Sequence, residues 1–345
     1  MDPVQKDCSD SMTPRHRFLS ALYGGRVDRP ATGSAVSMVT VELMSEVGVC
    51  FPDAHLDPEK MAMLAAAGHE ILGFDNIMPY FSVINEAEAL GCSVEWGTRD
   101  SMPEIKARPF NINEDVVVPA DFLEKPSIRV LLDSIRILHE KYGDRVCITG
   151  KAFGPWTLSY NLFGVDEFLM ATVLQPERVK EILAQLKEVT VMFGKAQIEA
   201  GADCLSIPDH ATRDLCSPEA YRDFLIPVHR ELGMRLGCPL ILHLCGYSLD
   251  RIPYIAETGM CCFHYDTRVN AQDARRATSN KISLMGGVNN PTTLLHGTPQ
   301  DVREEVRQAI EAGIEIIGPE CAVPLGTSIS NLKAITDEVR KPSRM

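Results

Sequence analysis

Three residues combine the side-chain types that bind a soft metal ion: His243, Cys245 and Cys321. His243 and Cys245 are two positions apart, so on a strand both side chains lie on one face. One imidazole and two thiolates suit Zn2+, whereas Mg2+ and Ca2+ prefer oxygen ligands. Three protein ligands leave one coordination position open, which is typical of catalytic zinc. The H-x-C spacing alone also fits a packed core pair, and it is the addition of Cys321 that favours a metal.

Cys321 lies far downstream of the pair, so the fold must bring it close. Short apolar segments recur along the chain, many of them nearly continuous, as in strands that are buried on both faces of a parallel sheet. We expect strands at 31–38, 76–80, 146–152, 204–208, 239–244, 261–265, 282–288 and 314–318.

Helical patterns fill the gaps between these strands. Asp57, Ser217 and Thr298 each precede a proline and are good N-caps, while Gly201 and Gly313 follow helix ends. We expect helices at 58–72, 176–200, 218–236 and 299–312. Strands alternating with helices favour a closed (β/α)8 TIM barrel. A doubly wound open sheet is the alternative, although the sequence has no GxGxxG or GxxxxGK[ST] loop to support it.

We expect one domain over residues 1–345. Residues 1–28 precede the first strand and are predicted to form a helical extension that packs on the barrel. Residues 81–127 contain strand-like pieces at 92–96 and 116–118 together with several prolines. We interpret this stretch as an insertion that covers the barrel mouth.

Composition narrows the possible partners and locations. The 345 residues are 45% hydrophobic and carry a formal net charge of −13, with no basic stripe for nucleic acid. No apolar run is long enough to cross a membrane, and the polar N-terminus does not resemble a signal peptide. We therefore expect a cytoplasmic protein. Its eleven cysteines are an odd number in a long chain, which argues against a disulfide framework.

Other polar residues follow the predicted strands, where the active site of a TIM barrel lies. Asp209 and His210 come after strand 204–208, and Asn289 comes after strand 282–288. We consider all three candidates for substrate binding. Asp209 and His210 could also orient a metal ligand, or serve only as a turn residue and a helix cap.

His243-Leu244-Cys245, with Cys321 far downstream in Gly-Pro-Glu-Cys-Ala-Val-Pro, resembles the H-x-C-x(n)-C zinc motif of the methylcobamide:coenzyme M methyltransferases. These enzymes belong to the uroporphyrinogen decarboxylase superfamily. The resemblance spans nearly the whole chain and includes segments 25–30, 86–92, 201–203 and 331–334.

The resemblance implies a (β/α)8 barrel that transfers a methyl group from a methylated corrinoid to a thiol. The donor would be methylcobalamin or a corrinoid protein, and the acceptor would be coenzyme M. Zinc would bind the thiol and favour its nucleophilic thiolate form. It also implies a carboxylate ligand at Asp266 when no substrate is bound; the alternative is a hydrogen-bonded residue at a strand end.

Two other functions stay open at this point. The decarboxylase branch of the superfamily carries an arginine-rich loop near its N-terminus that holds the substrate's carboxylates. The corresponding segment here, 33–38, contains no arginine, so a polycarboxylate substrate would lack its charge partners. A non-enzymatic zinc- or corrinoid-binding module is the other possibility, and the open three-ligand site argues against it.

Overall fold

The computed structural model of the chain describes residues 10–341. Its central feature is an eight-stranded sheet of parallel strands in the order β1-β10-β9-β8-β7-β6-β5-β2. The strands are β1 (Ala31–Thr32), β2 (Asn76–Ile77), β5 (Cys147–Lys151), β6 (Cys204–Pro208), β7 (Leu240–Leu244), β8 (Cys262–Tyr265), β9 (Ser283–Val288) and β10 (Ile316–Pro319). A strand is therefore present at each predicted position, although β1 and β2 are much shorter than predicted.

The sheet closes on itself between β1 and β2. The Asp75 amide donates to the Thr32 carbonyl at 2.8 Å, and the Asp75 carboxylate accepts from the Thr32 amide at 2.8 Å. The (β/α)8 barrel is confirmed, and the open doubly wound sheet is wrong. The predicted first strand is much shorter than 31–38. After Thr32, the Ser34 amide donates to the Asn76 side chain, and the Val36 amide donates to Ser34 Oγ, so side chains replace the strand ladder.

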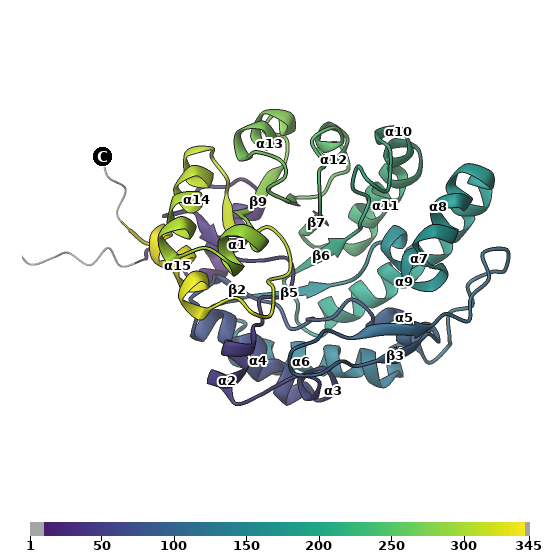
Figure 1. Cartoon of the computed structure of the whole chain (residues 1–345), viewed down its shortest axis with the longest axis horizontal. Helices are drawn as coiled ribbons and strands as arrows, with labels where there is room; N and C mark the ends of the chain where they lie inside the picture. Colours follow the sequence, from purple (N-terminus) through teal and green to yellow (C-terminus); the bar gives the residue numbers. More distant parts are fainter. Residues whose placement is uncertain (1–9, 342–345) are drawn as a thin grey trace, which may run out of the picture.

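Helices surround the strands in chain order, as the colours of Figure 1 show. They are α1 (Pro14–Leu22), α2 (Val41–Val47), α3 (Asp53–Leu56), α4 (Pro58–Glu70), α5 (Asn85–Leu90), α6 (Pro126–Tyr142), α7 (Pro155–Phe163), α8 (Val165–Leu174), α9 (Pro176–Glu199), α10 (Pro218–Ala220), α11 (Ile226–Leu236), α12 (Ile252–Ile255), α13 (Ala271–Thr278), α14 (Pro299–Glu311) and α15 (Ile329–Val339). Within residues 10–341, none of them has the length and apolar character needed to cross a bilayer.

The predicted N-caps act as expected. Asp57, Ser217 and Thr298 each accept a hydrogen bond from a backbone amide in the first turn of their helix. The predicted helix 218–236 is correct in extent but not in regularity, because a π-helical stretch, η2 (Tyr221–Leu225), joins α10 to α11. Pro227 explains the wider turn, since proline lacks the amide that a regular α-helix needs there.

The N-terminal end of the barrel is sealed by α1, which lies within the predicted extension. Phe18 and Leu22 of α1 pack in one apolar cluster with residues from the barrel interior. The buried Arg17 guanidinium fixes the helix, because it binds Asp28 at 2.6 Å and Asp75 at 2.8 Å. The Asp75 carboxylate therefore helps both to close the barrel between β1 and β2 and to hold α1 against its N-terminal end.

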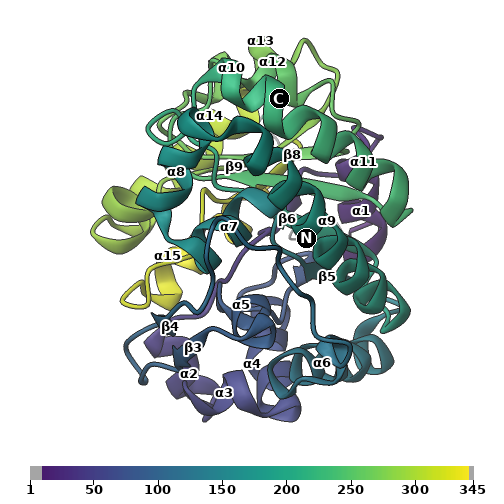
Figure 2. The same ribbon diagram turned by 90° about the vertical axis from the view of Figure 1, so that its right-hand side faces the viewer.

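The segment predicted to cover the mouth forms a short antiparallel hairpin of β3 (Ser93–Glu95) and β4 (Glu104–Ala107). Figure 2 shows it beside α2 and α3, and the Trp96 ring lies 6.0 Å from that of His55 in α3. The strand-like piece at 92–96 is present as β3. The piece at 116–118 is not a strand: the Val116 amide donates to the Gln185 side chain of α9, so its backbone is tied to a helix.

Candidate metal centre at the barrel mouth

The barrel brings His243, Cys245 and Cys321 together at the C-terminal ends of β7 and β10. Their ligand atoms all lie within 4.8 Å of one another. His243 Nε2 is 3.0 Å from Cys245 Sγ and 3.5 Å from Cys321 Sγ, and the two sulfur atoms are 2.8 Å apart. His243 is buried, whereas both cysteines are partly exposed, so the group can be reached from outside.

The donor set fits a tetrahedral zinc ion. Bonds of about 2.3 Å to sulfur and about 2.0 Å to nitrogen place ligand atoms roughly 3.5–3.8 Å apart. The 3.5 Å separation between His243 Nε2 and Cys321 Sγ is already of this size. The other two, at 2.8 and 3.0 Å, are shorter by about 1.0 and about 0.5 Å, so these side chains would have to move apart to hold the ion. Two sulfur atoms and one imidazole nitrogen favour zinc over a hard cation.

The neighbouring strand β8 sets the orientation of His243. Its Nδ1 donates to the His264 carbonyl at 3.3 Å, which leaves the lone pair of Nε2 free for a metal. The His264 ring packs against the His243 ring with centroids 4.4 Å apart. His264 Nε2 in turn donates to the Pro319 carbonyl at 2.8 Å, two residues before Cys321. One histidine therefore supports ligands from two different strands.

The two thiols form a coupled pair. The hydrogen bond from Cys245 lowers the pKa of Cys321 well below its ordinary value, and the nearby His243 imidazole acts in the same direction. Cys321 is accordingly the thiol that ionises first. A thiolate is the form that binds metal, so this environment suits a ligand.

Asp266, the predicted fourth ligand, lies next to the group but is not part of it. Its carboxylate accepts from the Gly246 amide at 2.7 Å and from the Arg268 amide at 2.9 Å. Gly246 follows Cys245 with a φ of +82°, and a Cβ there would lie 2.4 Å from Thr212 Oγ1. Asp266 and this glycine therefore shape the loop that carries Cys245. Ligation by Asp266 stays a prediction.

Asp209 and His210, predicted to contact substrate, occupy different environments. The buried Asp209 carboxylate accepts from the Thr157 amide at 2.8 Å and pairs with His229 Nε2 at 2.9 Å, so it ties α7 and α11 to β6. His210 is only partly buried. Burial, and to a smaller extent charge at His243, lower the pKa of His210. Of the two, His210 is the better placed to meet a substrate.

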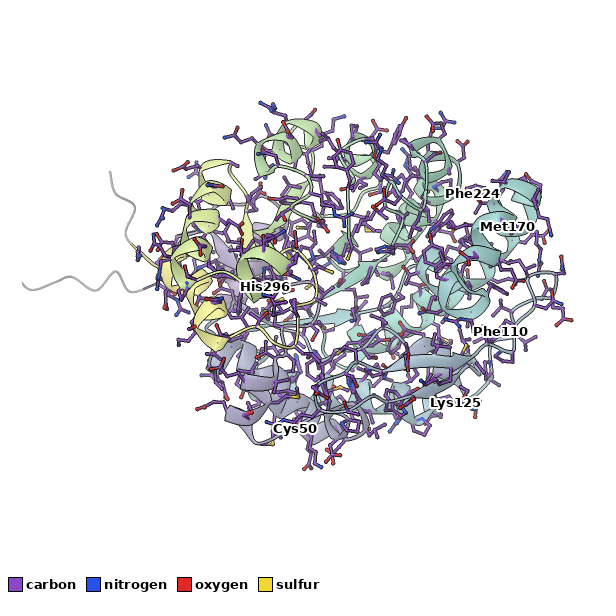
Figure 3. The ribbon with its side chains drawn as sticks, in the orientation of Figure 1. Cys50, Phe110, Lys125, Met170, Phe224 and His296 are labelled. Carbon is purple, nitrogen blue, oxygen red and sulfur yellow. The ribbon has the colours of Figure 1, made fainter. Side chains whose placement is uncertain are left out.

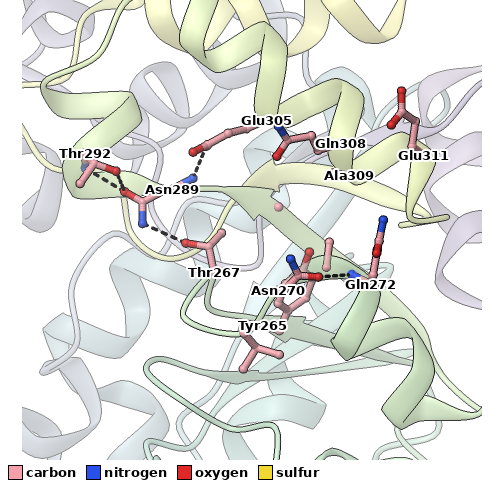
Figure 4. Close-up of a pocket in the computed structure, with 13 residues that line it drawn as sticks. Tyr265, Thr267, Asn270, Gln272, Asn289, Thr292, Glu305, Gln308, Ala309 and Glu311 are labelled. Carbon is pink, nitrogen blue, oxygen red and sulfur yellow. Dashed lines mark hydrogen bonds between the residues drawn. The ribbon is translucent and has the colours of Figure 1, made fainter.

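Asn289, the third predicted substrate contact, caps the π-helical turn η3 (Asn290–Leu295) by accepting from the Thr292 amide. It also donates to Thr267 at 2.9 Å. Figure 4 shows it on the wall of a pocket of about 400 Å3 between β8, β9, α13 and α14, which is not lined by the three metal-binding candidates. Asn289 also donates to the Glu320 carboxylate at 3.4 Å, and Glu320 directly precedes Cys321. This buried carboxylate accepts from Thr267 and Asn290 as well.

A polar cluster within the barrel was missed from the sequence. Lys151 ends β5, is only 2% exposed and donates to the Ser82 carbonyl at 2.9 Å. Its ammonium lies 4.2 Å from the centre of the Tyr80 ring. The Tyr80 hydroxyl donates to the buried Glu86 carboxylate, which also accepts from the Phe153 amide at 3.0 Å. A lysine closing the apolar run 146–152 was the feature that could have revealed this cluster.

Comparison with known proteins shows which family the chain belongs to. The model of the uroporphyrinogen decarboxylase (URO-D) family matches residues 13–342. A methylated-thiol–coenzyme M methyltransferase of Methanosarcina mazei is 35% identical over 94% of this chain and 88% of its own length. A methylcobamide:CoM methyltransferase of Methanosarcina barkeri is 32% identical over 94% of this chain and 96% of its own.

A solved structure of a methyltransferase from Methanosarcina mazei superimposes with a TM-score of 0.91 at 31% identity. The match covers 95% of this chain and 98% of the other. Fold, length and sequence agree across the whole barrel. The chain belongs to the uroporphyrinogen decarboxylase family, and within it to the methylcobamide:coenzyme M methyltransferases.

Proposed function

We propose that this protein is a zinc-dependent enzyme that transfers a methyl group from a methylated corrinoid to a thiol, with coenzyme M as the acceptor. The observation that carries the proposal is the group of one imidazole and two thiols at the barrel mouth. The names of the relatives support the corrinoid donor and the coenzyme M acceptor. The donor would arrive as methylcobalamin or on a corrinoid protein, in the cytoplasm.

His243, Cys245 and Cys321 would hold the zinc ion. When bound, zinc supplies a Lewis acid that keeps an acceptor thiol ionised at neutral pH. The backbone carbonyl of His264 fixes the tautomer of His243 that presents Nε2. Asp266 holds the Cys245–Gly246 peptide, so that the second ligand keeps its position.

The proposed methyl transfer is a nucleophilic displacement at the methyl carbon. The thiol loses its proton to solvent, and a sulfur lone pair forms the new carbon–sulfur bond. The cobalt–carbon bond breaks with both electrons staying on cobalt, so methyl-Co(III) becomes Co(I). The partly exposed Cys245 and Cys321 lie on the accessible side of the group, where an approaching corrinoid can meet the acceptor.

The test is zinc content together with demethylation of methylcobalamin in the presence of coenzyme M, for wild type, Cys321→Ala and Cys50→Ala. Cys50 is a matched control because it is also partly exposed but lies at the edge of the molecule, between α2 and α3 (Figure 3). We expect about one zinc per chain in wild type and Cys50→Ala. Cys321→Ala should lose both the metal and the turnover.

Two outcomes would contradict the proposal in different ways. Zinc without thiol methylation would leave the metal site in place and require another acceptor. Wild-type protein that binds no zinc would remove the mechanism and favour the decarboxylase alternative, which a carbon dioxide release assay would then test.

A further inference from the structure

The pocket between α13 and α14 lies on the outer side of the barrel wall (Figure 4). Cys262 of β8 belongs to the apolar cluster of the barrel interior, so Tyr265, three positions further on, faces the opposite side, toward the helices. The pocket has a volume of about 400 Å3. That is within the range of small-molecule sites and far more than one water molecule needs.

The hydroxyl of Tyr265 has no partner in this pocket. The Tyr265 side chain is fully buried, yet within residues 10–341 its hydroxyl forms no hydrogen bond. Buried hydroxyls are normally paired. A Cβ on Gly287 would lie 3.5 Å from Tyr265 Oη and 2.7 Å from Ala309 Cβ, so the glycine leaves space beside the hydroxyl. Gly287 and Ala309 both line the pocket, so a ligand bound there can reach Tyr265.

Two glutamates of α14, Glu305 and Glu311, line the same pocket and lack a counter-ion. The Glu305 carboxylate accepts from the Asn289 amide at 2.8 Å and from the Thr293 hydroxyl at 2.7 Å, which are both neutral donors. Burial raises the pKa of Glu305, so these two bonds do not fully replace the lost solvation. In the part of the chain that the structure describes, neither glutamate forms an ion pair.

The arginines of the two helices that frame the pocket are already paired elsewhere. Their partners are carboxylates outside the pocket lining: Glu315 for Arg275, Asp273 for Arg276, Glu338 for Arg303, and Glu304 for Arg307. Neither α13 nor α14 contains a lysine. The pocket therefore offers two carboxylates and a free hydroxyl without a positive charge, in a chain whose net charge is −13.

The spacing of the two carboxylates favours an elongated ligand over a bare ion. Glu311 follows Glu305 by six positions, which is a rise of about 9 Å along the helix. One ion cannot contact both side chains easily over such a distance, and within residues 10–341 three metal-ligand types cluster at the mouth of the barrel instead. Ala309, between the glutamates in sequence, and the buried Val269 give the pocket apolar surface.

We propose that this pocket binds an aliphatic diamine in its doubly charged form, with one ammonium at Glu305 and the other at Glu311. An ammonium has three donors and no acceptor, which matches the carboxylate oxygens and the oxygen of Tyr265. The carbon chain would lie against Ala309. The inference is independent of the proposed function, because the pocket lining contains none of the three metal-binding candidates.

The first test is calorimetry with 1,4-diaminobutane and with n-butylamine, at constant ionic strength. Both have the same carbon chain, but butylamine has one charge, so wild type should bind the diamine at least about tenfold more tightly. Glu305→Gln should weaken diamine binding about 10- to 100-fold, and the more exposed Glu311→Gln about 3- to 10-fold. Glu199→Gln removes an exposed carboxylate of α9 and should bind the diamine as wild type does.

Tyr265→Phe isolates the contribution of the hydroxyl. Because that hydroxyl has no partner within residues 10–341, its removal should leave the melting temperature of the free protein unchanged or higher. Diamine binding should nevertheless weaken about 3- to 10-fold. A merely structural tyrosine would show the reverse, a lower melting temperature with unchanged binding. Cys321→Ala should bind the diamine normally, since the metal group lies elsewhere.

Four results would overturn the inference. The first is no binding of the diamine to wild type. The second is equal affinity in wild type, Glu305→Gln and Glu199→Gln, which would indicate diffuse attraction to an acidic surface. The third is butylamine binding as tightly as the diamine. The fourth is displacement of the diamine by Mg2+ where NaCl of the same ionic strength has no effect, which would assign a metal site.

Discussion

The two ends of the barrel interior use the same residue type in opposite ways. At the N-terminal end, Cys147, Cys204 and Cys262 form part of an apolar cluster with α1. At the C-terminal end, Cys245 and Cys321 adjoin an imidazole. Burial raises the pKa of Cys147 and Cys262 well above the ordinary value for a thiol. At the mouth, hydrogen bonding from Cys245 lowers the pKa of Cys321.

The difference shows that neighbours, and not burial alone, decide what a cysteine does in this fold. Both groups are at least partly shielded from water. At the mouth, however, the Cys245 thiol and the His243 imidazole favour a thiolate at Cys321 strongly enough to outweigh its burial. The strand β8 contributes to both environments, the apolar cluster and the metal group, with residues two positions apart. Cys262 packs in the apolar cluster, and His264 supports the metal group.

The sharpest way to break this comparison is to change one cysteine at each end to serine. Cys245→Ser should lower metal affinity more than about 100-fold, since changing even a group that only supports a ligand costs 10- to 100-fold. Cys262→Ser should leave zinc content unchanged but destabilise the fold by about 1–3 kcal/mol, because a buried hydroxyl lacks a partner. Zinc analysis and urea unfolding measure the two effects. Equal zinc loss in both variants would contradict the division of roles.

Alkylation should separate the two groups of thiols kinetically. After removal of the metal at neutral pH, iodoacetamide should modify Cys321 more than about tenfold faster than Cys147 or Cys262, because the thiolate is the reactive form. Peptide mass spectrometry gives the rate at each position. Added zinc should protect Cys321 and leave the apolar cysteines unaffected. Modification of all three at one rate would mean that the chain opens globally before it reacts.

His264→Phe should have a smaller effect. The ring can still pack against His243, but the Pro319 carbonyl loses its hydrogen bond, so the strand end that leads to Cys321 is less well held. We expect metal affinity to fall about 10-fold. A competition titration with a zinc chelator measures it. His16→Phe, a change in the exposed part of α1, provides the control and should bind zinc as wild type does.

The barrel could be predicted from the sequence because its strands are continuous apolar runs and its helices have strong caps. Strand 204–208 is correct to the residue, and the caps at Asp57, Ser217 and Thr298 are confirmed. The grouping of His243, Cys245 and Cys321 followed from the rule that strand ends meet at one face. The prediction of a strand-like piece at 116–118 was wrong, because a hydrogen bond to the distant Gln185 side chain takes the place of pairing with another strand.

The polar lining of the mouth was much harder to predict. Asp209 and Asn289 are at strand ends, as functional residues should be, but their side chains are occupied in holding helices and turns. Lys151 and Glu86 come from a strand and from the helix α5, and only the folded chain brings them together. Which partner a polar side chain selects depends on tertiary contacts that no local pattern contains.

The three candidate metal ligands come from distant parts of the chain, so the site can form only late in folding. Cys321 follows β10, which must pair with both β1 and β9 before Cys321 Sγ can meet Cys245 Sγ, which follows β7. A nascent chain that has exposed only His243 and Cys245 holds two of the three candidate ligands and would have little affinity for zinc. Under the proposed function, tight zinc binding would therefore require the last strand to be in place, and zinc uptake during synthesis would mark the closure of the barrel.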